Sequence, residues 1–279
     1  NSLDYPGPFA HSEFSNPGII DPKTHRDALA SPEAAHWLAA TDGEMASWHD
    51  RGVYTAVPFV SGMIVVTGKW VFKTKLLSDL VTIDKYKARY CGRGFCQRRG
   101  VDFTETFAPT LQVTTLRLLL QIACSFSLVL RHFDIATAYL YANLDTVVHM
   151  QAAPGYETYD AHGRALVWML HKCVYGLKNS ARCWNKHLHD RLTALGFAQC
   201  PHDVCLYLRG SHDTNDFIAL ATYVDDLGAA GSNSATLDNL LAELREHFKM
   251  DDKGDLQWFL SIHLQRGPDS INASQTAYC

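Results

Sequence analysis

Apolar residues along the chain follow a helical period in some stretches and form short strand-like runs in others. Four stretches space their apolar residues three and four positions apart, as amphipathic or buried helices do: 32–50, 111–131, 181–195 and 234–248. Runs rich in branched and aromatic residues predict strands: 53–54, 63–66, 70–72, 132–135, 168–170, 174–175, 217–224 and 258–264. Several of these strands lie at hairpin distance from each other, which favours an α+β fold over a doubly wound parallel sheet.

Length and composition are those of an ordinary folded protein. The chain has 279 residues, 47% apolar and 19% charged, and can bury enough surface to fold without disulfides. No secretory signal is seen at the start, and the apolar run 118–130 is too short to span a bilayer. We therefore expect an intracellular protein with reduced thiols and no membrane partner. Residues 1–20 have several prolines and no periodicity, which is typical of a disordered leader.

Positive charge is concentrated in two segments. The net charge is −4, yet residues 69–99 hold nine Lys or Arg against two Asp, and residues 164–191 hold six against one. Basic segments in an otherwise acidic chain favour anionic ligands, phosphates in particular. Aromatic residues interleave with the charges of the first segment, as they do on surfaces that stack nucleic-acid bases. The alternative is that these basic side chains only solvate strand faces.

Three aspartates are candidates for a metal site. Asp225 and Asp226 lie between two apolar runs, which places them at the tip of a predicted hairpin, although Asp is also common in turns that have no function. Asp134 lies in a short strand after a predicted buried helix. If the two strands are neighbours, their carboxylates repel one another and persist together only with cations. Oxygen ligands of this kind suit Mg²⁺ in a two-metal phosphoryl-transfer site.

Seven stretches, in this order, resemble the reverse transcriptase domain of copia-type LTR retrotransposon polyproteins. They are 37–48, 69–75, 86–89 with 93–95, 102–109, 134–140, 174–178, and 248–250 with 258–260. In addition, Tyr223-Val224-Asp225-Asp226-Leu227 resembles the catalytic hairpin of reverse transcriptases. Each match is short, but their shared order over Asp21 to Cys279 is specific.

The resemblance implies a right-hand polymerase in which residues 21–279 form fingers and a ferredoxin-like palm, with the thumb truncated. The implied division gives the fingers 45–115 and 143–175, the palm 116–142 and 176–264, and the start of a connection 265–279. The implied partners are an RNA or DNA template with its primer, dNTPs, and the thumb, RNase H and integrase of the polyprotein. The implied location is a cytoplasmic particle or the nucleus.

The implied activity is RNA-directed DNA polymerisation, in which a primer 3′-OH attacks the α-phosphate of a dNTP. Asp134, Asp225 and Asp226 fall on the catalytic carboxylates and are expected to hold two Mg²⁺ ions, or Mn²⁺ in their place. Tyr139 falls on the position whose bulk excludes a ribose 2′-OH; the alternative is a core aromatic.

The resemblance also implies a set of nucleotide-binding residues. Lys73, Lys87 and Arg89 fall in the strands of the fingers that meet the triphosphate. Tyr175-Gly176 and Lys178 fall in the loop that holds nucleotide and template, where glycine lets the backbone approach a ligand closely. A solvated lysine is the alternative at position 178.

The chain departs from the family pattern at several positions. Asn179-Ser180-Ala181 stands where the family usually has Gln-Ser-Pro, Lys253 replaces an apolar residue, and Ser261 replaces a glycine. These departures indicate divergence or early decay of a transposon copy, and two other hypotheses stay open. One is a catalytically inactive retrotransposon remnant that binds nucleic acid only, and the other is a two-metal nuclease built on the same carboxylates.

Overall fold

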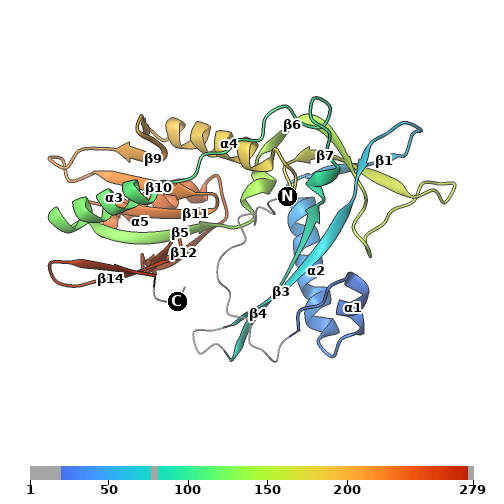
Figure 1. Cartoon of the computed structure of the whole chain (residues 1–279), viewed down its shortest axis with the longest axis horizontal. Coiled ribbons are helices and arrows are strands. Elements are labelled where there is room, and N and C mark those ends of the chain that lie inside the picture. Colours follow the sequence, from blue (N-terminus) through green and yellow to red (C-terminus); the bar gives the residue numbers. More distant parts are fainter. Residues whose placement is uncertain (1–19, 77–80, 276–279) are drawn as a thin grey trace, which may run out of the picture. The chain divides into compact units, whose positions relative to one another are not determined.

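The computed structural model describes residues 20–76 and 81–275, which divide into two compact units (Figure 1). Unit 1 combines Asn1–Glu105 with Asn143–Ser180, and unit 2 combines Thr106–Ala142 with Ala181–Cys279. Both units mix helices with strands, so the predicted α+β class is confirmed. Residues 1–19 of the predicted leader and residues 276–279 of the predicted connection lie outside the described residues.

In unit 1, two helices accompany a sheet of strand order β1-β7-β6-β2 and the antiparallel hairpin β3–β4. The elements are α1 (His25–Ala30), α2 (Ala34–Asp50), β1 (Tyr54–Pro58), β2 (Val65–Val66), β3 (Gly68–Leu76), β4 (Ile83–Gly92), the 3₁₀ turn η1 (Gly94–Cys96), β6 (Asn143–Met150) and β7 (Leu166–Lys172). β6 pairs antiparallel with β7 and parallel with β2.

Aromatic rings fill the core of unit 1. Trp168 of β7 stacks on Tyr54 of β1 with 4.0 Å between ring centroids, and it lies 5.6 Å from the ring of Trp48 on α2. The Trp48 indole is fully buried and donates to the carboxylate of Glu44 at 3.1 Å. Burial raises the pKa of Glu44, because desolvation disfavours its charged form. The Trp48 ring also lies 5.9 Å from that of Tyr90 on β4, so interlocked rings fix how α2 packs against β4.

Unit 2 is built on an antiparallel sheet with the strand order β12-β5-β11-β10-β9-β8. In that order, the strands are Met250–Asp255, Val129–Ile135, Asp226–Gly231, Ile218–Tyr223, Asp203–Arg209 and Ala198–Cys200. The other elements are α3 (Val113–Ser125), the 3₁₀ turn η2 (Ala138–Tyr141), α4 (Ser180–Ala194), α5 (Ser234–Arg245) and the small sheet β13 (Trp258–Phe259), β14 (Ile262–Arg266) and β15 (Ile271–Ser274).

Small residues on β11 let helices approach both faces of this sheet. Ala230 belongs to one buried cluster with Leu120 of α3. On the next residue, Gly231, an added Cβ would lie 2.7 Å from the side chain of Leu237 of α5. Because successive residues of a strand face opposite sides, α3 covers one face of the sheet and α5 covers the other.

Three of the predicted helices are confirmed as α2, α4 and α5, but the predicted helix 111–131 is too long. α3 ends at Ser125, Ser127 has a left-handed φ of 52°, and β5 begins at Val129 rather than at 132. Both elements are buried, and an apolar run does not by itself separate a buried helix from a buried strand. In the part of the chain that the structure describes, no helix has the length and hydrophobicity needed to cross a membrane.

The predicted strand 258–264 is wrong as a single element. Leu260 and Ser261 have φ values of 50° and 60° and form the turn between β13 and β14. Positive φ at both central residues is the pattern of a type I′ hairpin, which normally carries Asn or Gly, so Leu-Ser gives no turn signal. The predicted strand 174–175 is also wrong, because these residues lie in the loop between β7 and α4. The hydrophobic pattern missed α1, β4, β6, β8, β9, β12 and β15, although the resemblance had placed Lys87 and Arg89 of β4 in a strand.

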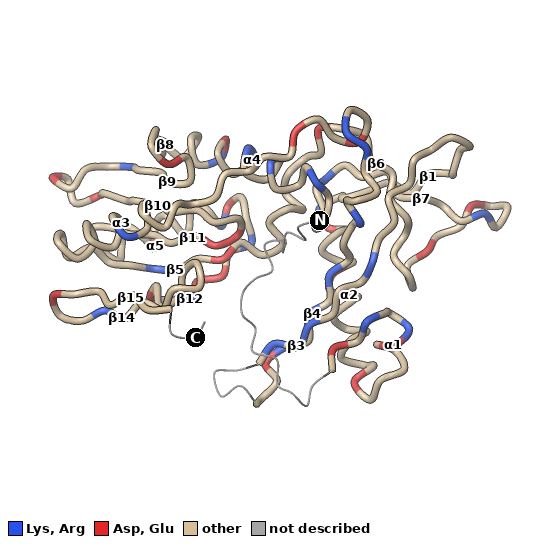
Figure 2. The backbone as a smooth tube through the Cα atoms, viewed as in Figure 1, with Lys and Arg blue, Asp and Glu red and all other residues tan. Residues whose placement is uncertain are grey.

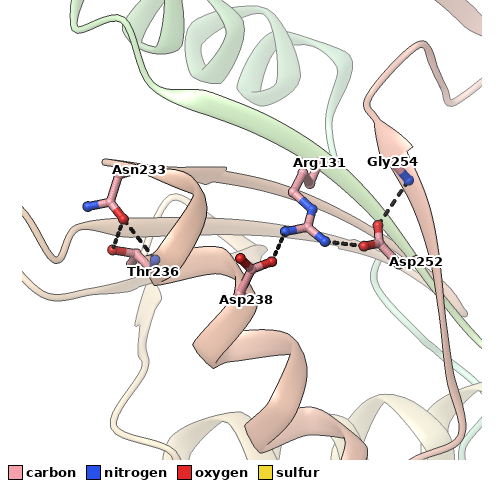
Figure 3. Close-up of polar contacts among 6 residues, drawn as sticks. All are labelled: Arg131, Asn233, Thr236, Asp238, Asp252 and Gly254. Carbon is pink, nitrogen blue, oxygen red and sulfur yellow. Dashed lines mark hydrogen bonds and ion pairs between the residues drawn. The ribbon is translucent and has the colours of Figure 1, made fainter.

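Arg131 links β5 to two neighbouring elements on the face of the sheet that α5 covers (Figure 3). Its Nη1 donates to Asp238 of α5, and its Nη2 donates to Asp252 of β12. Asp252 also accepts from the Gly254 N–H at 2.9 Å, and Asn233 caps the start of α5 nearby. The contacts of Arg131, which we call the Arg131 clamp, hold the edge strand β12 in register.

Asp252→Asn is expected to destabilise unit 2 at neutral pH but not in acid. Burial opposes ionisation of Asp252, but the Gly254 N–H and the Arg131 guanidinium outweigh it, so the pKa of Asp252 is lowered. A lowered pKa contributes stability above about pH 4 that is lost as the pH falls through the folded-state pKa. Urea unfolding should show a difference of about 1 kcal/mol from wild type at neutral pH that shrinks in acid.

Asp213→Asn, in an exposed turn, is the matched control and should follow wild type throughout. A deficit for Asp252→Asn that stayed constant from neutral to acid pH would contradict an ionic clamp.

Candidate active site

The hairpin β10–β11 turns through Val224 and Asp225, because Tyr223 is paired with Asp226. Val224 has a φ of 57°, in the left-handed region that branched side chains rarely adopt. Positive φ at the first central residue alone is the pattern of a type II′ turn, where glycine is preferred. A valine there stores strain of about 1–3 kcal/mol, and such strain is concentrated at active sites.

Two hydrogen bonds hold the strained turn. The Trp184 indole of α4 donates from Nε1 to the Val224 carbonyl at 2.7 Å. The Ile135 N–H at the end of β5 donates to the Asp225 carbonyl at 2.9 Å. Trp184 is buried, and its ring packs edge-on against Phe248. Both carbonyls of the turn are therefore fixed by groups from other elements.

The sheet register puts three aspartates in one row across neighbouring strands. Asp134 of β5 lies directly opposite Asp226 of β11 on one side and Asp251 of β12 on the other. Directly paired residues of an antiparallel sheet face the same side, with Cβ atoms about 5 Å apart. We call Asp226, Asp134 and Asp251 the carboxylate row. Asp225, in the turn, directly precedes one member of the row.

Two basic side chains contact the carboxylate row. His132, two residues before Asp134 on the same face, places Nε2 3.0 Å from Asp226 Oδ1. Lys253 places Nζ 3.9 Å from Asp134 Oδ2 and 3.5 Å from Asp251 Oδ2. The row is partly exposed, so its oxygens are accessible to solutes. The Lys253 ammonium therefore offsets part of the negative charge of the row.

The donors of the row suit Mg²⁺ although they form no closed cage. Within residues 20–76 and 81–275, no group of three or more His, Cys, Asp or Glu side chains is arranged to hold a metal ion. Mg²⁺ usually binds one or two carboxylates and completes its shell with water and substrate phosphates. Asp134 and Asp226, side by side and partly exposed, match that requirement, and Asp225 adjoins them.

Three of the basic residues predicted to bind the nucleotide lie in unit 1 on β3 and β4, the hairpin along which Figure 2 shows Lys and Arg positions in blue. Lys73 and Lys87 are register partners across this hairpin, and Lys73 also lies 3.6 Å from Asp21. The Arg89 guanidinium lies over the ring of Tyr175, 4.3 Å from its centroid. Repulsion between the paired lysines is reduced by an anion, whether Asp21 or a phosphate.

Gly176 is required by the packing of its loop on the segment after β4. It has a φ of 86°, and a Cβ there would lie 2.1 Å from the Gly92 carbonyl oxygen. The adjacent Tyr175 carbonyl accepts from the Gly92 N–H at 2.8 Å. The Lys178 N–H donates to Gln97 Oε1 at 2.7 Å, while its ammonium lies over the Phe103 ring. Gly176 is therefore needed for a close contact with the backbone of the chain itself, at Gly92, whereas the resemblance related this glycine to a ligand.

The structure thus assigns the predicted site residues to two sets. Asp134, Asp225 and Asp226 come together in unit 2. Tyr139 is in the same unit, in η2, with only 4% of its surface exposed. The other set belongs to unit 1: Lys73, Lys87, Arg89, Tyr175, Gly176 and Lys178.

Trp184, His132 and Asp251 were missed by sequence reasoning. Only His132 carries a signal that could have identified it, because a residue two positions before Asp134 in a strand shares its face. The contribution of Trp184 depends on how α4 packs, and that of Asp251 depends on the pairing of β12 with β5.

Comparisons with known proteins match the chain to one family model and to several polyproteins. The family model "Reverse transcriptase (RNA-dependent DNA polymerase)" matches residues 51–279. The Retrovirus-related Pol polyprotein from transposon TNT 1-94 of Nicotiana tabacum is 31% identical over 88% of the chain and 18% of that protein. The corresponding polyprotein from transposon RE1 of Arabidopsis thaliana is 30% identical over 91% of the chain and 17% of that protein. The chain therefore spans less than a fifth of either relative.

This match covers most of the chain and defines its class. The protein belongs to the reverse transcriptase family, in the type found in the Pol polyproteins of retrotransposons, which confirms the family expected from the order of the motifs.

Trp184→Phe is expected to loosen the Val224–Asp225 turn. Loss of the indole N–H leaves the Val224 carbonyl without this donor, at a cost of about 1 kcal/mol in the free energy of unfolding. Amide hydrogen exchange should accelerate at Ile135, whose N–H is held by the same turn. Trp258→Phe, at a half-exposed indole of β13, is the control. Equal exchange at Ile135 in the two variants would show that the indole bond does not hold the turn.

Proposed function

We propose that the chain is the polymerising part of an RNA-directed DNA polymerase and that unit 2 carries its reaction centre. The observation that supports this most directly is the register of Asp134 opposite Asp226, next to the strained turn that carries Asp225. Family membership independently supports nucleotidyl transfer as the reaction. The proposed substrates are a dNTP and a primer 3′-OH on an RNA or DNA template.

In this proposal, the aspartates hold the charge that the reaction needs. Two Mg²⁺ ions, when bound, supply the positive charge that activates the primer 3′-OH and stabilises the leaving pyrophosphate. Asp134 and Asp225 are the main ligands, and Asp226 contributes less directly. The bonds from Trp184 and Ile135 keep the Asp225 backbone in one position, so the ligands are organised before substrate arrives.

The two units take the roles of the two polymerase subdomains in this proposal. Unit 2, with its antiparallel sheet covered by helices, is the ferredoxin-like palm, and unit 1 is the fingers. The boundaries of the units support that division. The basic residues Lys73, Lys87 and Arg89 contribute phosphate binding, together with the Tyr175–Lys178 loop. The rest of a longer polyprotein is the proposed partner, since the matched relatives are several times longer than the chain.

Asp134→Asn and Asp225→Asn are expected to lower dNTP incorporation by about 100-fold or more, because each removes a charged metal ligand at the point of bond formation. The assay is Mg²⁺-dependent extension of a DNA primer on an RNA template, with a chain that includes a thumb. Asp213→Asn, the control, removes one negative charge at an exposed turn of unit 2, and this variant should extend the primer as wild type does.

Each outcome of this assay separates the hypotheses. Unchanged extension by Asp225→Asn would overturn the proposed centre. No extension by wild type, together with salt-dependent RNA binding, would favour an inactive remnant. Cleavage of unprimed nucleic acid would favour a nuclease.

Tyr139→Val is expected to raise the ratio of ribonucleotide to deoxynucleotide incorporation by about tenfold or more, because the lost ring no longer excludes a 2′-OH. The variant is also expected to lose about 3 kcal/mol of stability, since Tyr139 is buried. Tyr139→Phe keeps the ring and is the control, with the wild-type ratio expected. A less stable Tyr139→Val with an unchanged ratio would identify Tyr139 as a core aromatic only.

A further inference from the structure

Lys253 occupies a position that the motif pattern does not explain. By the resemblance described above, an apolar residue is expected at this position, yet the ammonium of Lys253 reaches the carboxylate row. The Nζ atom lies 3.9 Å from Asp134 Oδ2 and 3.5 Å from Asp251 Oδ2. Its charge is therefore shared between two neighbouring members of the row.

The backbone that carries Lys253 is held in place from the other face of the sheet. The register of β12 on β5 shifts between Asp252 and Asp255, which is a bulge that contains Lys253. Bulges redirect the side chains that they carry. The Arg131 clamp binds Asp252, the residue before Lys253, to β5 and α5 (Figure 3). The direction of the lysine is thus a consequence of how β12 is fixed.

The electrostatics of the row explain what the ammonium does there. Three carboxylates on adjacent strands repel one another, and one positive charge between two of them reduces that repulsion. A divalent cation that binds Asp134 reduces the same repulsion between carboxylates, with twice the charge of the ammonium. Lys253 is about half exposed, at 47% of its side chain, so it can swing into solvent when another cation takes its place.

We propose that Lys253 is a tethered counter-ion of Asp134 that competes with the divalent cation and so sets the metal concentration at which the site loads. The inference rests on the metal site of the proposed function, and it adds a residue that lowers the affinity of that site for the cation. Lys253 acts through Asp134, and it is a positioning residue rather than a ligand. The alternative role for an ammonium at this place is to bind an anion such as a triphosphate. The experiment distinguishes a counter-ion of Asp134 from an anion-binding lysine.

The experiment titrates Mn²⁺ into the full chain without nucleotide and follows binding by electron paramagnetic resonance. Lys253→Leu restores the residue type of the family, and Lys253→Gln keeps a polar side chain of similar length. Both should bind Mn²⁺ about fivefold more tightly than wild type, the size expected for loss of a half-exposed ion pair. Lys253→Arg keeps the charge and should bind as wild type does. Lys249→Gln removes a lysine just before β12 and is the matched control.

The outcomes are distinct for the inference and for the proposed function. Unchanged Mn²⁺ affinity in Lys253→Leu and Lys253→Gln, with wild type binding Mn²⁺, overturns the counter-ion and leaves the metal site standing. The same result with weaker dATP binding assigns the lysine to the anion. Absence of Mn²⁺ binding in wild type and in every variant overturns both the counter-ion role of Lys253 and the metal site of the proposed function.

Tighter Mn²⁺ binding by Lys253→Leu and Lys253→Gln, without primer extension by wild type or any variant, supports the counter-ion role and overturns the proposed polymerase activity. Thermal denaturation of each variant confirms that it is folded.

Discussion

The pairing of β5 with β11 is the constraint on which the site depends. Because side chains alternate along a strand, a shift of one residue would turn Asp134 to the opposite face, away from Asp226. Burial opposes that shift, since Phe133 and Ile135 are fully buried on the other face of β5. The Ile135 N–H bond to the Asp225 carbonyl and the Arg131 clamp act in the same direction. The backbone therefore brings the carboxylates together even though they repel.

Backbone strain and charge repulsion both occur where β5 pairs with the start of β11, next to the β10–β11 turn. Val224 is held in a left-handed conformation, and the carboxylate row brings like charges onto adjacent strands. Each is offset locally, the strain by the Trp184 hydrogen bond and the charge by the Lys253 ammonium, while His132 contacts Asp226. Under the proposed function, the backbone of such a site has little left to rearrange when a cation and a phosphate bind, and only the Lys253 side chain moves away; a fixed backbone of this kind is the physical basis of electrostatic preorganisation.

Much of the candidate site could be predicted from the sequence, and most of what was missed depends on contacts between distant residues. The acidic pair at a hairpin tip and the single Asp134 in a strand are local features, and the structure places them side by side. Asp251 was missed because β12 follows no strand pattern: its residues after Met250 are polar and exposed. The I′ turn at Leu260 was missed because neither residue has the usual turn chemistry.

The sequence by itself determined the α+β class, the main helices, the order of the motifs and, through them, the family. These depend on periodicity and on short stretches of residues, which are local properties of the chain. Only the tertiary structure decided which strands are neighbours, that Asp251 and Lys253 join Asp134, and that an indole from α4 holds the turn. Strand order and side-chain reach follow from how buried surfaces pack together, and no local pattern contains that information.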